Sequence, residues 1–288
     1  MLTKEQFHDL IGDGVRFLDG ATGSNLRLAG MPKDACAELW CLEHPDVITD
    51  LQRRYYEAGS QILYAPTFQA QPIALERYHL EDNTESINAK LMALSRSAAP
   101  GALIAGDLTT LAALLDVQDP NNIDLMVENY RRQIHGLMDG GADLLVAETL
   151  IHPMEAEAIQ AAAELEGAGA VMFSFTMFSE GSLFPGMDAG PVLRELEQSG
   201  AAAVGFNCVI GDMMTPYLVR TLRKYVRGPL LCKPNAGTPV IREDGVAEYS
   251  MGSDEFAQIM HECRLCGGTL LGGCCGTDPE FIRKMIQY

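Results

Sequence analysis

The stretch Gly140-Gly-Ala-Asp-Leu-Leu-Val-Ala-Glu-Thr149 carries a pattern that occurs four times along the chain and determines the fold. In this pattern a glycine ends a helix in the left-handed conformation, and an apolar run follows at once. The other occurrences are Ala58-Gly-Ser-Gln-Ile-Leu-Tyr-Ala-Pro-Thr67, Ser199-Gly-Ala-Ala-Ala-Val-Gly-Phe-Asn-Cys208 and Cys266-Gly-Gly-Thr-Leu-Leu-Gly-Gly-Cys-Cys275. Because the apolar runs do not alternate with polar residues, they predict buried parallel strands that directly follow helices.

Reactive side chains recur at one level of the four repeats. Counting onward from the glycine, the seventh residues are Pro66, Glu148, Asn207 and Cys274, and the eighth are Thr67, Thr149, Cys208 and Cys275. This level is the carboxyl end of each predicted strand. A (β/α)8 barrel collects its active site there from several strands, although an open doubly wound sheet also binds ligands at strand ends.

The number of strands favours a closed barrel over an open sheet. Eight apolar runs alternate with helical patterns, at Val15–Asp19, Ile62–Phe68, Ala102–Leu108, Asp143–Leu150, Ala170–Thr176, Ala202–Cys208, Pro229–Pro234 and Gly268–Cys274. Eight such units in about 250 residues are typical of an α/β protein with the (β/α)8 TIM-barrel fold. We therefore predict one barrel domain over residues 1–288, with its active site at the C-terminal ends of the strands.

One segment of the predicted barrel interrupts the regular alternation. Residues Phe178 to Pro191 are rich in glycine and proline, which indicates a long loop over the barrel mouth. A helix is expected after this loop, up to about Gln198.

Composition and charge exclude several classes of protein. The chain has 288 residues, of which 47% are hydrophobic and 21% charged, and this excludes disordered, collagen-like and coiled-coil proteins. The formal net charge is −18, so nucleic acid and anionic membranes are poor partners. No apolar run reaches the roughly 18 residues that span a bilayer, and the first residues do not resemble an export signal. These features predict a cytoplasmic protein.

Three of the eight cysteines are candidate metal ligands. A reducing compartment keeps cysteines as thiols, so we expect thiols or ligands rather than disulfides. Cys208 ends one predicted strand, and Cys274 and Cys275 end the last one between glycines that allow the strand to break. Three thiolates from two strands suit a tetrahedral Zn²⁺ whose fourth position stays open. Cys36, Cys41, Cys232 and the Cys263-x-x-Cys266 pair have no predicted role.

An all-sulfur ligand set constrains the chemistry of such a site. Sulfur ligands donate charge to zinc and weaken its ability to ionise water, which argues against a hydrolase. A thiol bound at the open position would lose its proton near neutral pH and remain nucleophilic. The sequence therefore predicts alkylation of a thiol. A zinc-binding barrel that acts as a non-catalytic scaffold is the alternative from a different class.

Several motifs resemble one known family. They are Leu18-Asp-Gly-Ala-Thr-Gly23, Glu38-Leu-Trp40, His44-Pro-Asp-Val-Ile48, Thr67-Phe68, Glu148-Thr149, Gly205-Phe-Asn-Cys208, Pro234-Asn-Ala-Gly237 and Gly273-Cys-Cys-Gly-Thr277. In this order, and over nearly the whole chain, they resemble the zinc-dependent homocysteine S-methyltransferases. The Gly-Gly-Cys-Cys-Gly-Thr element is the most specific of them. The resemblance also implies a (β/α)8 barrel.

The resemblance implies a role for particular residues. It makes Cys208, Cys274 and Cys275 the zinc ligands and gives the fourth position to the sulfur of homocysteine. The turn Asp19-Gly20-Ala21-Thr22 would bind the amino-acid end of the substrate, because successive N–H groups in such a turn can hold a carboxylate. Glu148 would pair with the ammonium group, and Asp19 would bind the ammonium or only fix the turn. Asn207 and Asn235 would form hydrogen bonds beside the metal.

The methyl donor stays open at this point. Lys233-Pro-Asn-Ala-Gly-Thr-Pro239 and Gly245-Val-Ala-Glu-Tyr249 resemble the homocysteine-binding module of cobalamin-dependent methionine synthase. This implies transfer of a methyl group to homocysteine to give methionine. The donor would be methylcobalamin on a separate corrinoid protein, or S-methylmethionine or S-adenosylmethionine. A corrinoid-dependent system that acts on another thiol or methylated substrate is the second interpretation.

Two segments depart from the pattern of this family. Where the family often has a Gly-Pro loop after the third strand, this chain has Gly106-Asp-Leu-Thr-Thr-Leu111. After the second strand, an Asn-Thr-Phe-Gly pattern is replaced by Ala65-Pro-Thr-Phe-Gln69. Both segments lie where substrate and donor should meet, so the acceptor or the donor can differ from those of the family.

Overall fold

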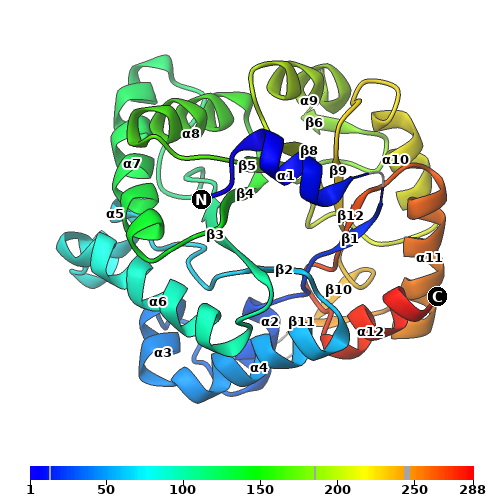
Figure 1. Ribbon diagram of the computed structural model, residues 1–288, viewed down its shortest axis with the longest axis horizontal. Coiled ribbons are helices and arrows are strands. Elements are labelled where there is room, and N and C mark those ends of the chain that lie inside the picture. The colour runs from blue at the N-terminus through cyan, green and yellow to red at the C-terminus, as the bar shows by residue number, and fades with distance from the viewer. Residues whose placement is uncertain (13, 185, 243–246) are drawn as a thin grey trace.

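A computed structural model describes residues 1–12, 14–184, 186–242 and 247–288. Eight parallel strands form the central sheet in the order β1-β12-β9-β8-β5-β4-β3-β2, and a parallel bridge between Leu18 and Ile62 joins its two ends (Figure 1). The strands are β1 (Arg16–Phe17), β2 (Ile62–Tyr64), β3 (Leu103–Thr109), β4 (Leu144–Leu150), β5 (Val171–Phe175), β8 (Ala203–Asn207), β9 (Leu230–Lys233) and β12 (Leu270–Leu271). The predicted (β/α)8 barrel is confirmed, and each of these strands lies within or overlaps a predicted one.

Helices surround the sheet and cover its outer face (Figure 1). They are α2 (Gly23–Leu28), α3 (Ala37–Glu43), α4 (Pro45–Ala58), α5 (Pro72–Leu75), α6 (Thr84–Ala98), α7 (Ile123–Asp139), α8 (Pro153–Glu166), α9 (Ala189–Gln198), α10 (Thr215–Leu222), α11 (Ser253–Leu265) and α12 (Pro279–Gln287). Short 3₁₀ turns occupy Glu76–Tyr78, Glu81–Asn83 and Pro120–Asn122. No helix in these described ranges is long and apolar enough to cross a membrane.

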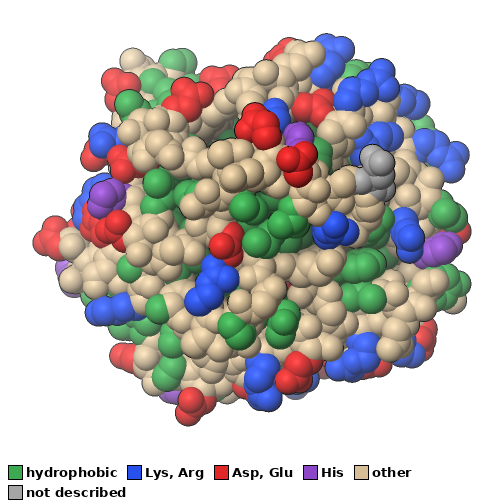
Figure 2. All heavy atoms as spheres, viewed as in Figure 1, with side chains coloured by type: hydrophobic (Ala, Val, Ile, Leu, Met, Phe, Trp, Pro, Cys, Tyr) green, Lys and Arg blue, Asp and Glu red, His purple; other side chains and the backbone are tan. Residues whose placement is uncertain are grey.

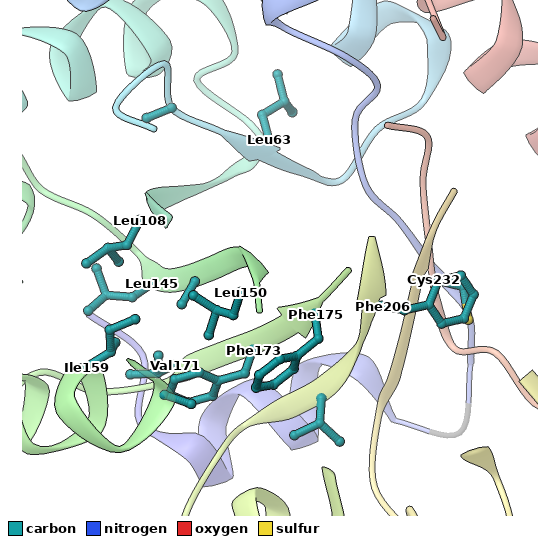
Figure 3. Packing of buried hydrophobic residues seen from close by; sticks show 14 of the residues in the cluster. Leu63, Leu108, Leu145, Leu150, Ile159, Val171, Phe173, Phe175, Phe206 and Cys232 are labelled. Carbon is teal, nitrogen blue, oxygen red and sulfur yellow. The ribbon is translucent and has the colours of Figure 1, made fainter. Parts of the chain in front are cut away.

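Side chains alternate between two apolar layers along each strand. Outward-facing residues pack against the helices, as where Leu145 of β4 and Val171 of β5 meet Ile159 of α8 (Figure 3). Inward-facing residues such as Leu144 and Met172 fill the barrel. The alternation follows from the pleat of a strand, which sends successive side chains to opposite faces.

Helix α1 (Lys4–Ile11) closes the amino end of the barrel. Thr3 and Gln6 cap its first turn reciprocally, which satisfies two backbone N–H groups. Phe7 and Ile11 belong to the cluster inside the barrel, and His8 Nε2 lies 2.8 Å from the carbonyl oxygen of Ala202. The open end of the barrel is therefore the carboxyl end of the strands.

Two short hairpins extend the loops at the carboxyl end. The predicted long loop over Phe178 to Pro191 is wrong in part, because β6 (Ser182–Phe184) pairs with β7 (Met187–Asp188) and α9 begins at Ala189. Pro185 within that segment lies outside the described residues. The expected end of the helix near Gln198 is correct. The second hairpin joins β10 (Pro239–Ile241) and β11 (Ala247–Tyr249) and was not predicted, and Gly245 lies outside the described residues.

Acidic and basic side chains both occur across one face of the molecule (Figure 2). Most of the ion pairs join exposed side chains, as do those of Arg53 with Asp50 and Glu57. Such pairs contribute little to stability because water and salt screen them. The packed barrel and its helix layer therefore carry most of the stability.

The closure by α1 gives a first prediction. Phe7→Ala removes a fully buried ring from the bottom of the barrel and should lower the free energy of unfolding by about 3 to 5 kcal/mol in a urea titration. Leu10→Ala on the same helix is the control, because Leu10 is 40% exposed and its truncation should have a small effect. Equal effects of the two substitutions would contradict the assignment of α1 as a plug.

Candidate metal centre

Three cysteine sulfurs meet at the carboxyl end of the barrel. Cys208 Sγ lies 3.8 Å from Cys275 Sγ, and Cys275 Sγ lies 4.0 Å from Cys274 Sγ. All three sulfur atoms are within 4.8 Å of one another. Tetrahedral zinc with ligands at about 2.3 Å places its sulfurs about 3.8 Å apart. The group therefore has dimensions that fit one metal ion, and all three thiols are free rather than disulfide-bonded.

The backbone leaves the strand conformation at each of these cysteines. Strand β8 ends at Asn207, and Cys208 has φ of 55°, in the left-handed region. Strand β12 ends at Leu271, so Cys274 and Cys275 both lie beyond it. The Cys274 N–H donates to the Pro234 carbonyl at 2.7 Å. Two neighbouring cysteines can contribute to one group because they are no longer part of a pleated strand.

The three thiols share protons, and their hydrogen bonds shift the pKa values of the individual thiols in opposite directions. Hydrogen bonds from Cys208 and Cys274 lower the pKa of the Cys275 thiol to about 3. Hydrogen bonds with Cys274 and Cys275 raise the pKa of Cys208, because its proton is held between sulfurs. Three adjacent thiolates repel one another, and a bound divalent cation removes this repulsion. The donor set is thus chemically suited to zinc, in agreement with its dimensions.

Asn207 connects the cysteines to the end of β4. Its Oδ1 accepts hydrogen bonds from the Thr149 N–H at 2.7 Å and the Ser174 hydroxyl at 3.0 Å. Its Nδ2 donates to Thr149 Oγ1 at 2.7 Å and faces Glu148 Oε2 at 3.3 Å and Cys274 Sγ at 3.9 Å. Thr149 has φ of 61°, and the hydrogen bonds of Asn207 hold it there. Asn207 therefore fixes the relative positions of Glu148 and Cys274.

A buried lysine lies beneath the cysteines. Lys233 Nζ is 3.2 Å from Asp19 Oδ1 and 3.8 Å from Glu148 Oε2, and it lies 4.2 Å above the ring of Tyr64. Burial alone would lower the pKa of Lys233, but Asp19 and Glu148 raise it well above its usual value. Burial raises the pKa of Glu148 to about 7, and Lys233 opposes this rise. The two carboxyl groups therefore favour the charged form of Lys233, and the lysine in turn offsets part of their negative charge.

Sequence reasoning missed this lysine and two further residues. Lys233 and Asp107 were overlooked although each interrupts a strongly apolar predicted strand, which was an available signal. Tyr249 was missed because it depends on the unpredicted hairpin. A Cβ atom at Gly276 would lie 2.2 Å from Tyr249 Cγ, so the tyrosine ring packs directly on the backbone beside Cys275. Burial and a hydrogen bond with Cys275 raise the pKa of Tyr249.

The other predicted site residues lie around this group. Asp19 Oδ2 accepts from the Tyr64 N–H at 2.8 Å, and Oδ1 forms an ion pair with Lys233 but has no hydrogen-bond partner among the described residues. The Ala21 N–H donates to Thr277 Oγ1 at 3.1 Å, and a Cβ at Gly20 would meet the Tyr55 hydroxyl at 2.6 Å. Thr22 directly precedes α2. Asn235 is buried beside the Val209 carbonyl, to which its N–H donates at 2.9 Å, and its Oδ1 has no hydrogen-bond partner among the described residues.

Fold and site together define a barrel enzyme with a three-cysteine group at the carboxyl ends of its strands. The sequence model of the family described as homocysteine S-methyltransferase matches residues 16–288. The chain therefore belongs to the homocysteine S-methyltransferase family.

Curated relatives include methionine synthases, and a solved structure shares the fold. The chain is 28% identical over 291 residues to methionine synthase of Mycobacterium leprae, covering 93% of this chain and 24% of that protein. It is 28% identical over 296 residues to methionine synthase of Mycobacterium tuberculosis, covering 96% of this chain and 25% of that protein. It thus spans about a quarter of the length of these relatives. The metallated homocysteine methyltransferase MmuM from Escherichia coli has the same fold, with a TM-score of 0.77 and 24% identity. The match covers 94% of this chain and 95% of that chain.

The contact between Gly276 and Tyr249 gives a second prediction. Gly276→Ala places a methyl group into the tyrosine ring at a left-handed backbone position with φ of 82°, and should both destabilise the protein and lower its zinc content. Gly141→Ala is a matched control, because φ is 81° and no atom lies within 4 Å of the added Cβ. In both variants the free energy of unfolding should fall by about 1 to 2 kcal/mol, because alanine disfavours the left-handed conformation. Only Gly276→Ala should lose metal, which elemental analysis measures. Equal zinc content in both variants would contradict a role of the Gly276–Tyr249 contact in metal binding.

Proposed function

We propose that this protein transfers a methyl group to the thiolate sulfur of homocysteine, giving methionine, with zinc held by Cys208, Cys274 and Cys275. The observation that carries the proposal is the convergence of three sulfurs directly above buried carboxylates that can bind an ammonium group. Family membership and the methionine synthase relatives support homocysteine as the acceptor. A scaffold role does not account for carboxylates buried beside the three thiols.

The residues of the chain bind and orient the acceptor in this proposal. Zinc on the three cysteines supplies a Lewis acid that lowers the pKa of the acceptor thiol, so that a thiolate forms near neutral pH. Glu148 holds the ammonium end by a charge-assisted contact in a site from which water is largely excluded. Asn207 keeps Glu148 and Cys274 at a fixed separation, and this separation orients the sulfur.

Alignment of acceptor and donor then completes the reaction. A sulfur–carbon bond forms as the bond between the methyl carbon and the donor breaks, and that bond's electrons remain with the donor. Such a displacement requires the sulfur, the carbon and the leaving atom to lie in line. A sulfur fixed at the barrel mouth leaves one direction of approach, from outside the barrel.

Exposed apolar side chains around this mouth support a donor carried by a protein. Seven large apolar residues that are at least 46% exposed lie on three segments, namely the loop after β5, the loop after β8 with the first turn of α10, and strand β10: Phe178, Ile210, Met213, Met214, Tyr217, Val240 and Ile241. We refer to them as the apolar rim. The segments are neighbours, since the Asn235 N–H donates to Val209 and a Cβ at Gly181 would lie 3.4 Å from Leu218 of α10.

The apolar rim favours one of the two kinds of donor. A small sulfonium donor is bound by a pocket and needs no exposed apolar surface outside it, whereas exposed apolar patches mark protein interaction sites. One segment of the rim, from Ile210 to Tyr217, follows Cys208 closely in the chain, so a protein bound there would lie next to the three cysteines. We therefore propose methylcobalamin on a corrinoid protein as the donor, consistent with relatives about four times as long as this chain.

Loss of a single cysteine ligand tests the metal assignment. Cys208→Ala and Cys274→Ala should each abolish zinc binding and methyl transfer to homocysteine while the circular dichroism spectrum stays that of a folded barrel. Cys266→Ala is the control, because this cysteine ends α11 and does not belong to the three-sulfur group. Full zinc content and full activity in both ligand variants would refute the assignment.

The donor is tested by comparing carried and free methyl groups. Met213→Gln combined with Tyr217→Gln should slow transfer from a methylated corrinoid protein about 10-fold or more, because both side chains lie at least half exposed on the rim. Transfer from free methylcobalamin should be unchanged. Leu165→Gln, an equally exposed apolar residue at the end of α8, is the control. Efficient transfer from S-methylmethionine that is insensitive to the rim substitutions would contradict a protein-borne donor.

A further inference from the structure

Asp107 is a buried carboxyl group whose side chain has an unused oxygen. It lies on the inward face of β3 and is 5% exposed. Its main chain is held firmly, since its N–H donates to Thr67 Oγ1 at 3.0 Å and its carbonyl accepts from Gln133 Nε2 at 3.1 Å. Oδ1 of its side chain has no hydrogen-bond partner among the described residues. A buried carboxylate oxygen without a donor is costly and indicates a missing partner.

The charges around Asp107 show which kind of partner is missing. Three buried carboxyl groups, those of Asp19, Asp107 and Glu148, belong to one electrostatic cluster, in which Lys233 is the one cation among the described residues. The ion pairs of Lys233 in the described part of the chain are with Asp19 and Glu148. Burial, and then the charge of Glu148, raise the pKa of Asp107 well above its usual value. One additional cation bound between Asp107 and Glu148 would reduce the excess of negative charge in this cluster.

Strand register brings Asp107 and Glu148 to the same side of the barrel. Strands β3 and β4 are paired, with Asp107 opposite Val146 and Thr109 opposite Glu148. Residues 107 and 148 both face inward, because Leu108 and Ala147 pack in the outer layer. The Thr109 hydroxyl donates to the Glu148 carbonyl at 2.9 Å and fixes the ends of these strands together.

We propose that Asp107, with Glu148, binds the ammonium group of the acceptor. Asp19 is paired with the cation of Lys233 at 3.2 Å, whereas the ion pairs of Lys233 among the described residues do not include Asp107. This inference rests on the proposed function, since it assigns a residue to the homocysteine ammonium. It assigns a specificity-determining role to a position at which the chain departs from its family, within Gly106 to Leu111. The hydroxyl of Tyr64, which is also buried and without a hydrogen-bond partner among the described residues, lies on the adjacent strand β2.

Asp107→Asn tests the proposal, because it removes the charge and keeps the shape. Zinc-loaded wild type and variant are compared by calorimetry and by methyl transfer, with homocysteine and with 4-mercaptobutanoate, which is homocysteine without its amino group. The substitution should weaken homocysteine binding and raise its KM about 10- to 100-fold, the effect of losing a charge-assisted hydrogen bond. Affinity and KM for 4-mercaptobutanoate should be unchanged. Asp124→Asn, on the exposed face of α7, is the control.

The other outcomes are equally decisive. Equal loss for both thiols, or no loss for either, would overturn the role of Asp107 in ammonium binding. A wild-type protein that binds both thiols equally would overturn it as well. If Asp107→Asn is not folded by circular dichroism, Asp107→Ser is measured in the same way. A wild-type protein that methylates neither thiol, while calorimetry still shows an Asp107-dependent preference for homocysteine, would refute the proposed function and leave the ammonium site intact.

Discussion

The ion pair between Asp19 and Lys233 ties together the strand ends on which the site depends. Oδ1 of Asp19 meets the lysine at 3.2 Å, and Oδ2 accepts from the Tyr64 N–H of β2. The main chains of the same two residues hold the cysteine segments. The Asp19 carbonyl accepts from Gly273 N–H, and the Lys233 carbonyl accepts from Cys208 N–H. Removing one partner of such a buried pair leaves an uncompensated charge at a cost of about 3 to 5 kcal/mol. Because the same two residues also hold the cysteine segments through their main chains, the closure of the barrel and the positions of the sulfurs are coupled.

Backbone strain is concentrated at the same level of the barrel. Among the described residues, the non-glycine positions with positive φ are His79, Thr149 and Cys208, and two of these three lie in the site. Each such position costs roughly 1 to 3 kcal/mol and persists only where its surroundings enforce it. Asn207 supplies that enforcement by bonding to both the N–H and the hydroxyl of Thr149. A regular strand would point Cys208 and Asn207 to opposite faces, and the turn at Cys208 allows both to serve one site.

The repeat at the strand ends was sufficient to predict the barrel from the sequence. A glycine followed by an apolar run fixes where a helix stops and a buried strand begins, and each of the four repeats precedes a barrel strand, namely β2, β4, β8 and β12. The two short hairpins and the plug formed by α1 were not predicted, because they depend on contacts between distant segments. Lys233 illustrates the limit for the site. Its position in an apolar strand was visible, but its partners Asp19 and Glu148 come from two other strands that only the closed barrel brings near.

The outer surface is strongly acidic, the rim of the barrel mouth is apolar, and the charges beneath the rim are buried; each of these features acts over a different distance. A net charge of −18 repels acidic partners, but at physiological salt this repulsion falls off over about 8 Å. Apolar contacts at the rim act only at direct contact, so they stabilise a complex after the partner has arrived. Beneath the rim the charges are buried, and salt screens them far less. In the function proposed above, the surface charge would act on the approach of a partner and the rim on the complex once formed. The buried carboxylates with Lys233 would act on the choice of acceptor.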